Sequence, residues 1–384
     1  MSGGPGSPAR RGAAAREELA ALAGPGHAQA AAARGRLAAL ALEARNASAE
    51  AAGLPPLGSV EAYAAELARR TVCLTLLAGS GSRWLASLAE ARGRGDPAAL
   101  AFDPERPRGL FPVADYLRPP APGSASDGPR RGSLPVAAYA LAAVRGLGRH
   151  LLVVRGWEEA IDAEILAPLG IGPGEREFFT QEAPFGKPLG HGDAAWQCRS
   201  RWARADYVLA NFGGDANSRR TALASLLVLD ALSGPGGGGP AGAVDLLVPA
   251  APVRLPAYPI ELDAGGLPSS FGQAKLQGRK VEVEAGYTNV GIRVYRAGAL
   301  LEKVESIRRR FWAEGSGYAI PGNDPAGREF ALDNVDAELA AEGRARILAA
   351  ARPEELTPAK NYGDIPAFEA AMARVAAEAG GAPD

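Results

Sequence analysis

Residues 71–83, TVCLTLLAGSGSR, are the stretch from which the fold can be predicted, because an apolar run ends there in two glycines, a serine and an arginine. Residues 71–77 carry no charge and are mostly aliphatic or β-branched, which is typical of a buried strand in a parallel sheet. The glycines let the backbone turn tightly with its N–H groups toward a ligand, and Arg83 adds a positive charge. The turn therefore suits a phosphate chain, although the same pattern can form a tight connection that binds nothing.

Length and composition narrow the class of protein. The 384 residues allow one main domain, which we place at residues 59–384 after a disordered and helical extension at residues 1–58. A formal net charge of −1 argues against a surface that binds nucleic acid. Cys73 and Cys198 are too few for a disulfide framework, which favours a cytoplasmic location. The apolar runs are too short or too interrupted for a signal sequence or a membrane span, so we expect no membrane contact.

Predicted strands and helices alternate along the chain, which indicates an α/β protein. We expect strands at residues 71–77, 150–154, 177–181, 205–212, 244–248, 280–284 and 287–295. We expect helices at residues 59–70, 85–91, 134–145, 194–204, 218–232, 299–310, 335–351 and 366–377, with others between residues 15 and 50. Residues 1–14, 118–132 and 234–242 are rich in glycine, proline, serine or alanine, and we expect them to be disordered or mobile.

Polar residues follow several of the predicted strands, where open α/β sheets bind ligands. Asp215 lies in the glycine-rich turn after residues 205–212 and could bind magnesium or cap the following helix. Gln181 precedes a glycine-rich loop, residues 183–193, that opens a helix. The prolines around Arg108 favour an extended basic segment, which could cover phosphates bound by the first glycine turn or simply be solvated.

Taken in order, these segments resemble the nucleotide-sugar pyrophosphorylases, especially the uridylyltransferases that make UDP-glucose and UDP-N-acetylhexosamines. The family motif A-G-G-x-G-T-R is similar to residues 77–83, and P-K-G is similar to residues 107–109, with arginine in place of lysine. G-H-G-D stands unchanged at residues 190–193, and the late motif P-V-K-x-x-x-D-L is similar to residues 358–365. The resemblance covers roughly residues 71–375. It implies a Rossmann-like domain of the GT-A type, a three-layer α/β/α structure with a mixed, mainly parallel sheet.

The resemblance also implies which residues would bind an NTP, with UTP favoured, and a sugar 1-phosphate. The nucleotide would contact Leu77, Ala78, Gly79, Ser80, Gly81, Gln181 and Gly190, the sugar would contact His191, Asn217 and Asn289, and the catalytic cations would be Arg83, Arg108 and Lys360. Asp215 and Asp364 would share Mg²⁺ or Mn²⁺. His191 could instead make a structural hydrogen bond, Asn289 could cap a turn, and Lys360 could be an ordinary surface lysine.

Departures from the family pattern leave other functions open. Ala78, Ser82 and Arg108 stand where the family has other residues, which allows reduced activity or a non-catalytic relative that only binds nucleotide. Asp215 and Asn217 could form a variant of the D-x-D motif of a GT-A glycosyltransferase. The base and the acceptor could also be those of a cytidylyltransferase that acts on another alcohol phosphate. The sequence leaves the oligomeric state undetermined.

Overall fold

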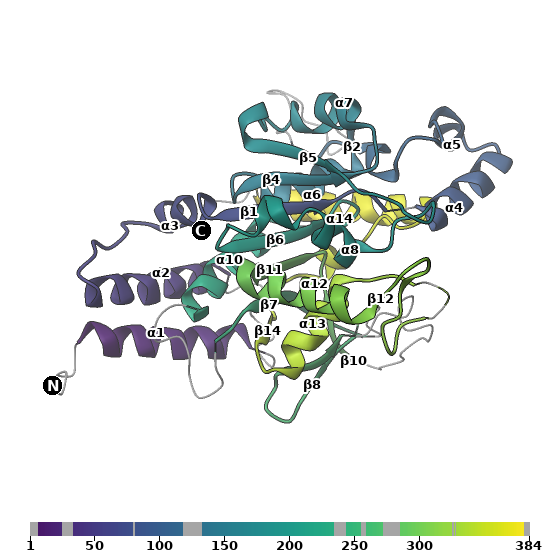
Figure 1. The fold of residues 1–384 in the computed structure, drawn as a ribbon. Coiled ribbons are helices and arrows are strands. Elements are labelled where there is room, and N and C mark those ends of the chain that lie inside the picture. Colours follow the sequence, from purple (N-terminus) through teal and green to yellow (C-terminus); the bar gives the residue numbers. More distant parts are fainter. Residues whose placement is uncertain are drawn as a thin grey trace, which may run out of the picture.

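Ten strands of the described residues form one mixed sheet at the centre of the protein (Figure 1). The computed structural model describes residues 7–24, 34–79, 81–117, 133–233, 243–254, 259–271, 285–324, 326 and 328–379. The strand order is β5-β4-β1-β6-β11-β7-β10-β8-β9, and β14 also pairs with β7. The bounds are β1 (Thr71–Leu76), β4 (Arg149–Val154), β5 (Arg176–Thr180), β6 (Tyr207–Phe212), β7 (Leu246–Arg254), β8 (Pro259–Leu262), β9 (Pro268–Phe271), β10 (Ala285–Asn289), β11 (Ile292–Arg296) and β14 (Ala345–Leu348).

Parallel strands make up the half of the sheet that leads to the candidate site. β1 pairs in parallel with β4 and β6, and β4 pairs in parallel with β5. β11 lies antiparallel between β6 and β7, and β14 pairs in parallel with β7. The predicted α/β class with a mixed, mainly parallel sheet is thus confirmed. Because β1 and β6 are parallel neighbours, the turn at residues 77–83 and Asp215 follow them at the same edge of the sheet.

Helices cover both faces of this sheet. Their bounds are α1 (Pro8–Ala23), α2 (Arg34–Ala51), α3 (Val60–Ala68), α4 (Ser82–Gly93), α5 (Pro97–Ala101), α6 (Val136–Val144), α7 (Glu158–Ile161), α8 (His191–Gln197), α9 (Arg199–Trp202), α10 (Arg219–Ser233), α12 (Ala297–Phe311), α13 (Leu332–Ala341) and α14 (Ile365–Ala379). One apolar core joins α1, α2, α3 and α10 to the sheet, and a second joins α8, α12 and α13 to it. None of the described helices is both long enough and apolar enough to cross a membrane.

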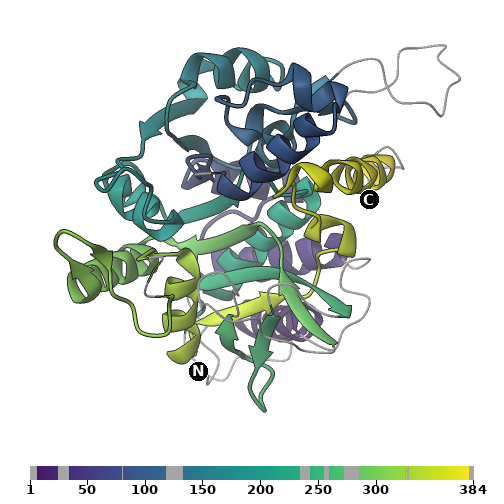
Figure 2. The ribbon, with the colours of Figure 1, turned by 90° about the vertical axis from the view of Figure 1, so that its right-hand side faces the viewer.

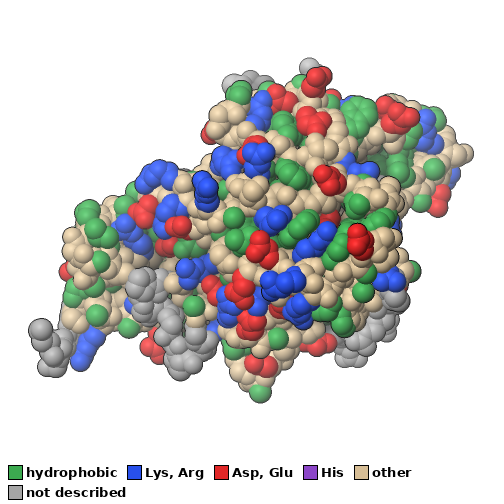
Figure 3. Space-filling model, in the orientation of Figure 1, with side chains coloured by type: hydrophobic (Ala, Val, Ile, Leu, Met, Phe, Trp, Pro, Cys, Tyr) green, Lys and Arg blue, Asp and Glu red, His purple; other side chains and the backbone are tan. Residues whose placement is uncertain are grey.

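The N-terminal helices are part of this packing. α1 lies against α2, and α2 lies against α10 (Figure 1). Ser59 caps α3 as the sequence predicts, because its side chain accepts a hydrogen bond from the Ala62 N–H at 3.2 Å. The predicted disorder of residues 1–14 is wrong from Pro8 onward, where α1 begins. On the face that Figure 3 shows, acidic and basic side chains are interspersed, and neither sign forms a large patch.

Two predicted elements are wrong in the C-terminal half. Residues 335–351 do not form one helix: α13 ends at Ala341, Gly343 has a φ of 70°, and β14 follows. The short apolar run of β14 is compatible with a helix or a strand, and it forms a strand because it pairs with β7. Residues 287–295 form two strands rather than one, because β10 pairs with the end of β7 whereas β11 pairs with β6. The segments predicted at residues 118–132, 234–242 and 280–284 lie outside the described residues.

His150 on β4 should make stability depend on pH. Its side chain is buried, its Nδ1 atom has no hydrogen-bond partner among the described residues, and burial lowers its pKa to about 4. A neutral His150 therefore stabilises the fold fully above pH ~6.5, and this contribution is lost as the pH falls toward the folded-state pKa.

We expect wild-type protein to lose about 2–3 kcal/mol more unfolding free energy between pH 7 and pH ~4.5 than a His150→Phe variant. Urea unfolding of both proteins at the two pH values measures the difference. The buried ring is replaced by one of similar size, so the comparison isolates the titration. If the unfolding free energies of the two proteins depended equally on pH, His150 would not be the residue whose protonation destabilises the fold.

Candidate active site

Five of the predicted site residues form a charge cluster, which we define as Arg83, Arg108, Asp215, Lys360 and Asp364. Burial lowers the pKa values of both Arg108 and Lys360, and Arg83 lowers them further. The carboxylates of Asp215 and Asp364 oppose this effect on both cations. The two carboxylates and the three cations therefore lie in one place, although they come from four separate segments of the chain.

Glycines at the end of β6 and before β11 let the cluster pack closely against the backbone. A methyl group on Gly214 would lie 2.3 Å from Nη2 of Arg108. A methyl group on Gly291 would lie 2.2 Å from Oδ2 of Asp215. Any larger residue at either position would have to displace a charged group of the cluster. The sequence does not mark Gly291 as a site residue; the predicted sugar contact nearby is Asn289, two residues earlier.

The C-terminal segment joins the cluster through its backbone. The Ala359 N–H donates to the Gly214 carbonyl at 2.8 Å, and an isolated antiparallel bridge joins Asp215 to Pro358. Oδ2 of Asp364 accepts hydrogen bonds from the N–H groups of Lys360 at 2.8 Å and Asn361 at 2.7 Å. One Asp364 oxygen thus fixes the backbone of Lys360, so Asp364 has a structural task whatever else it binds.

An apolar cluster under α4, α5, α6 and α14 supports these segments from below. It contains Ala216 and Ala359, the sequence neighbours of Asp215 and Lys360, and both alanines are fully buried. Figure 2 shows the C-terminal segment in yellow beside the blue segment that follows β1. The contact is direct, because the Tyr362 N–H donates to Ser87 Oγ on α4 at 2.8 Å. The backbone around both charged groups is therefore anchored in a core.

The first glycine turn lies at the carboxyl end of β1. The Leu77 N–H donates to the Val153 carbonyl at 2.8 Å, Ala78 is buried and Gly79 is exposed. Gly81 has a φ of 63° and precedes the first residue of α4, so glycine is favoured there. Ser80 lies outside the described residues. Phosphate binding by this turn stays a prediction.

Gln181 and Gly190, the predicted base-binding pair, are in contact. Nε2 of Gln181 donates to the Gly190 carbonyl at 3.3 Å, and the Gln181 side chain lies close enough to the Asp193 carboxylate to lower the pKa of Asp193. Asp193 is buried, which raises its pKa, and it accepts hydrogen bonds from Gln197 at 2.7 Å and Tyr318 at 2.6 Å. Both partners of the Gln181 amide are acceptors, so its NH₂ group faces them and its Oε1 atom is left to accept.

The three predicted sugar contacts are placed differently from one another. Asn217 is buried, its Nδ2 donates to Asn211 Oδ1 at 2.8 Å, and its Oδ1 has no hydrogen-bond partner among the described residues. His191 accepts the Leu332 N–H at Nδ1 at 2.9 Å, and its Nε2 lies 3.6 Å from Asp333 Oδ2. Both His191 nitrogens thus face α13, which favours the structural alternative. Asn289 is half-buried at the end of β10, two residues before Gly291.

A buried ionic network beneath His191 was not predicted. Arg293 on β11 contacts Asp333 at 3.0 Å and also bonds to Asp336, and its guanidinium lies 5.2 Å from the centre of the Phe212 ring. These residues are distant in sequence and belong to no sequence motif. Only the packing of α13 against the sheet could have identified them.

The charge cluster offers a partial set of magnesium ligands. Within the described residues, no group of three or more His, Cys, Asp and Glu side chains is placed to hold a metal ion. Magnesium in enzymes that act on phosphates is usually held by one or two carboxylates together with substrate phosphates and water. Asp215 and Oδ1 of Asp364 fit that incomplete set.

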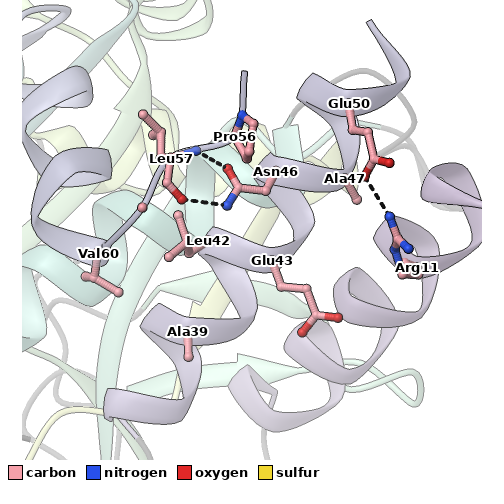
Figure 4. Close-up of a pocket in the computed structure, with 11 residues that line it drawn as sticks. Arg11, Ala39, Leu42, Glu43, Asn46, Ala47, Glu50, Pro56, Leu57 and Val60 are labelled. Carbon is pink, nitrogen blue, oxygen red and sulfur yellow. Dashed lines mark hydrogen bonds and ion pairs between the residues drawn. The ribbon is translucent and has the colours of Figure 1, made fainter. Parts of the chain in front are cut away.

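Two cavities lie away from the cluster. One of about 470 Å³ is bounded by α1, α2 and residues 56–60, with Glu43 pointing into it and Arg11 paired with Glu50 at 2.6 Å (Figure 4). The other, of about 520 Å³, is lined by apolar side chains with Arg145 and Arg219. Neither cavity includes a residue of the charge cluster.

Comparison with known proteins gives no family. No protein-family model matches the chain, and no curated protein matches it. The motifs, the fold and the charge cluster are therefore the observations that bear on function.

Proposed function

We propose that this protein is a nucleotidyltransferase of the pyrophosphorylase type, with a catalytic domain of the GT-A type, that joins UTP and a sugar 1-phosphate. The observation that carries the proposal is the charge cluster: three cations around two carboxylates at the shared carboxyl-end edge of β1 and β6. The excess of positive charge suits polyanions, and the carboxylates suit a divalent cation. The mixed sheet, with antiparallel β11 among parallel strands, agrees with the GT-A type.

The proposed reaction needs positioning rather than covalent catalysis. A phosphate oxygen of the sugar 1-phosphate would attack the α-phosphorus of UTP, forming one P–O bond as the bond to pyrophosphate breaks. Arg83 and Arg108 would hold the triphosphate, and Lys360 would hold the acceptor phosphate against it. Arg108 can grip two phosphate oxygens at once, so it can replace the lysine of the family motif.

A magnesium ion would be held by Asp215 and Asp364 and would offset the negative charge of the phosphates. The protein would supply the rest of that effect from fixed cations, of which Arg108 and Lys360 are half-buried and so act in a lower dielectric than water. Because the Lys360 N–H donates to Oδ2 of Asp364, the acceptor phosphate and the metal would be positioned by the same segment.

The orientation of the Gln181 amide favours uracil over cytosine. Oε1 of Gln181 is an acceptor, and uracil offers an N3–H donor where cytosine offers a lone pair. A cytosine in the same pose would therefore place two acceptors together, which costs more than a missing contact.

A Gln181→Leu variant should lower the ratio of UTP to CTP turnover by about 10- to 100-fold, because one discriminating hydrogen bond is worth about 1–3 kcal/mol. kcat/KM for both nucleotides measures the ratio. Thr180→Ala, a change at the exposed neighbouring residue, is the matched control. An unchanged ratio would show that Gln181 does not read the base.

A screen for pyrophosphate release tests the function itself. Four NTPs are combined with a panel of sugar 1-phosphates and other phosphomonoesters in the presence of magnesium, and nucleotide product is measured alongside pyrophosphate. We expect equal amounts of UDP-sugar and pyrophosphate, and none from the Asp215→Asn variant. Turnover of CTP with a polyol phosphate would identify a cytidylyltransferase. Transfer from a finished nucleotide sugar would identify a glycosyltransferase, and magnesium-dependent NTP binding without turnover would identify a non-catalytic relative.

A further inference from the structure

A buried ion pair connects α2 to the two segments that carry Asp215 and Lys360. Nη1 of Arg34, the first residue of α2, lies 3.6 Å from Oε2 of Glu355, and their side chains are 8% and 0% exposed. Glu355 belongs to a short helical turn, Pro353–Leu356, that precedes Lys360. A pair so fully removed from water is retained only where it is well hydrogen-bonded.

Glu355 caps the N-terminus of α10 from a distant part of the chain. Its Oε1 accepts the Ser218 N–H at 3.0 Å, and its Oε2 accepts the Thr221 hydroxyl at 3.0 Å. Oε2 also accepts the Arg352 N–H at 2.8 Å, which holds its own turn. A carboxylate is favoured at this end of a helix by the unpaired N–H groups and the helix dipole.

Arg34 completes the same network from the other side. Its Nη1 donates to Thr221 Oγ1 at 2.9 Å and to Ser218 Oγ at 3.2 Å, and it offsets the charge of Glu355. Ser218 is three residues after Asp215, and Glu355 is five residues before Lys360. This hydrogen-bond network therefore fixes the distance between the segment that carries Asp215 and the segment that carries Lys360.

We propose that Arg34 and Glu355 are positioning residues that set the separation of Asp215 and Lys360, which makes α2 a supporting part of the catalytic site. The kinetic consequence rests on the proposed function, whereas the structural consequence does not. A domain boundary at residue 58 would separate Arg34 from its partners, so residues 59–384 alone would lack part of the support for the site.

The test uses Arg34→Met and Glu355→Gln in the 384-residue chain. Each variant keeps the size of the side chain and removes its charge. Arg36→Met is the matched control, because Arg36 lies on the same helix but forms an exposed pair with Glu18. Hydrogen exchange is measured across residues 213–221 and 353–364, and kcat and KM are measured for UTP and the sugar phosphate.

We expect exchange about tenfold faster in both segments for Arg34→Met and Glu355→Gln, with the sheet strands unchanged and kcat reduced about tenfold or more. Arg36→Met should match wild type. Unchanged exchange in the two segments would overturn the proposal, and so would faster exchange with wild-type kcat and KM. If Arg34→Met does not fold, Arg34→Lys replaces it. This variant keeps the charge but loses the planar guanidinium group, and the same exchange and kinetic measurements are applied to it. A wild type without pyrophosphorylase activity would overturn the proposed function instead, and the exchange result would still decide whether the network positions the two segments.

Discussion

Asp215→Asn should reduce magnesium-dependent pyrophosphate release by about 10³-fold or more, because a metal ligand supplies several kcal/mol of charge stabilisation. The substitution keeps the size of the side chain and removes its charge. The bridge from Asp215 to Pro358 and the burial of Ala216 do not depend on that charge, so the fold should persist. Steady-state rates at several magnesium concentrations measure the loss, and the unfolding temperature checks the fold.

Asp206→Asn is the control for this variant. Asp206 lies just before the opposite end of β6, where its exposed side chain pairs with Arg70 at 2.8 Å. Exposed pairs contribute little, so this variant should keep wild-type rates and stability. Wild-type turnover in Asp215→Asn would remove Asp215 from the metal site. Asp364 is the less informative choice, because one of its oxygens also holds the backbone at Lys360.

Lys360→Met should lower kcat by about 10²- to 10³-fold, which is the usual effect of removing one group that stabilises developing charge. Methionine replaces the aliphatic stem and removes only the ammonium group. Because Ala359 and Asp364 fix the backbone on both sides of Lys360, the loss should not reflect a displaced segment. Lys360→Arg should retain part of the wild-type rate, because its guanidinium keeps the positive charge but differs in shape from the ammonium group.

Arg374→Met is the matched control for Lys360. Arg374 is on α14, and its exposed side chain lies 3.4 Å from Glu354. Loss of that pair should leave kcat and KM unchanged. Equal rates for wild type and Lys360→Met would show that the similarity of residues 358–365 to the family motif is coincidental.

The local features of the site could be predicted because each depends on neighbouring residues. An uncharged run ending in glycines predicts a buried strand and a turn, and the structure places β1 and the turn where the sequence does. The position of Asp215 could be predicted in the same way, because the uncharged run that forms β6 also ends in glycines. The family resemblance implied Gln181 and Gly190 as base contacts, and the loop between them brings them into contact.

The predicted helix at residues 335–351 is wrong because the strand that decides its structure is far away in sequence. Residues 345–348 could be helical or extended, and only the free edge of β7 makes them a strand. The sugar contacts implied for Asn217 and His191 stay predictions, because Nδ2 of Asn217 donates to Asn211 while its Oδ1 has no partner among the described residues, and Nδ1 of His191 accepts the Leu332 N–H.

The sequence by itself determined the α/β class, the glycine turn after β1 and the acidic residue after β6, since local pattern sets strands and turns. The family resemblance implied that Arg108, Asp215, Lys360 and Asp364 lie together, but only the tertiary structure shows that they form one charge cluster and that Arg34 pairs with Glu355 beside it. The physical reason is that a buried charge is stable only beside its partners, and those partners are brought together by the packing of helices on the sheet.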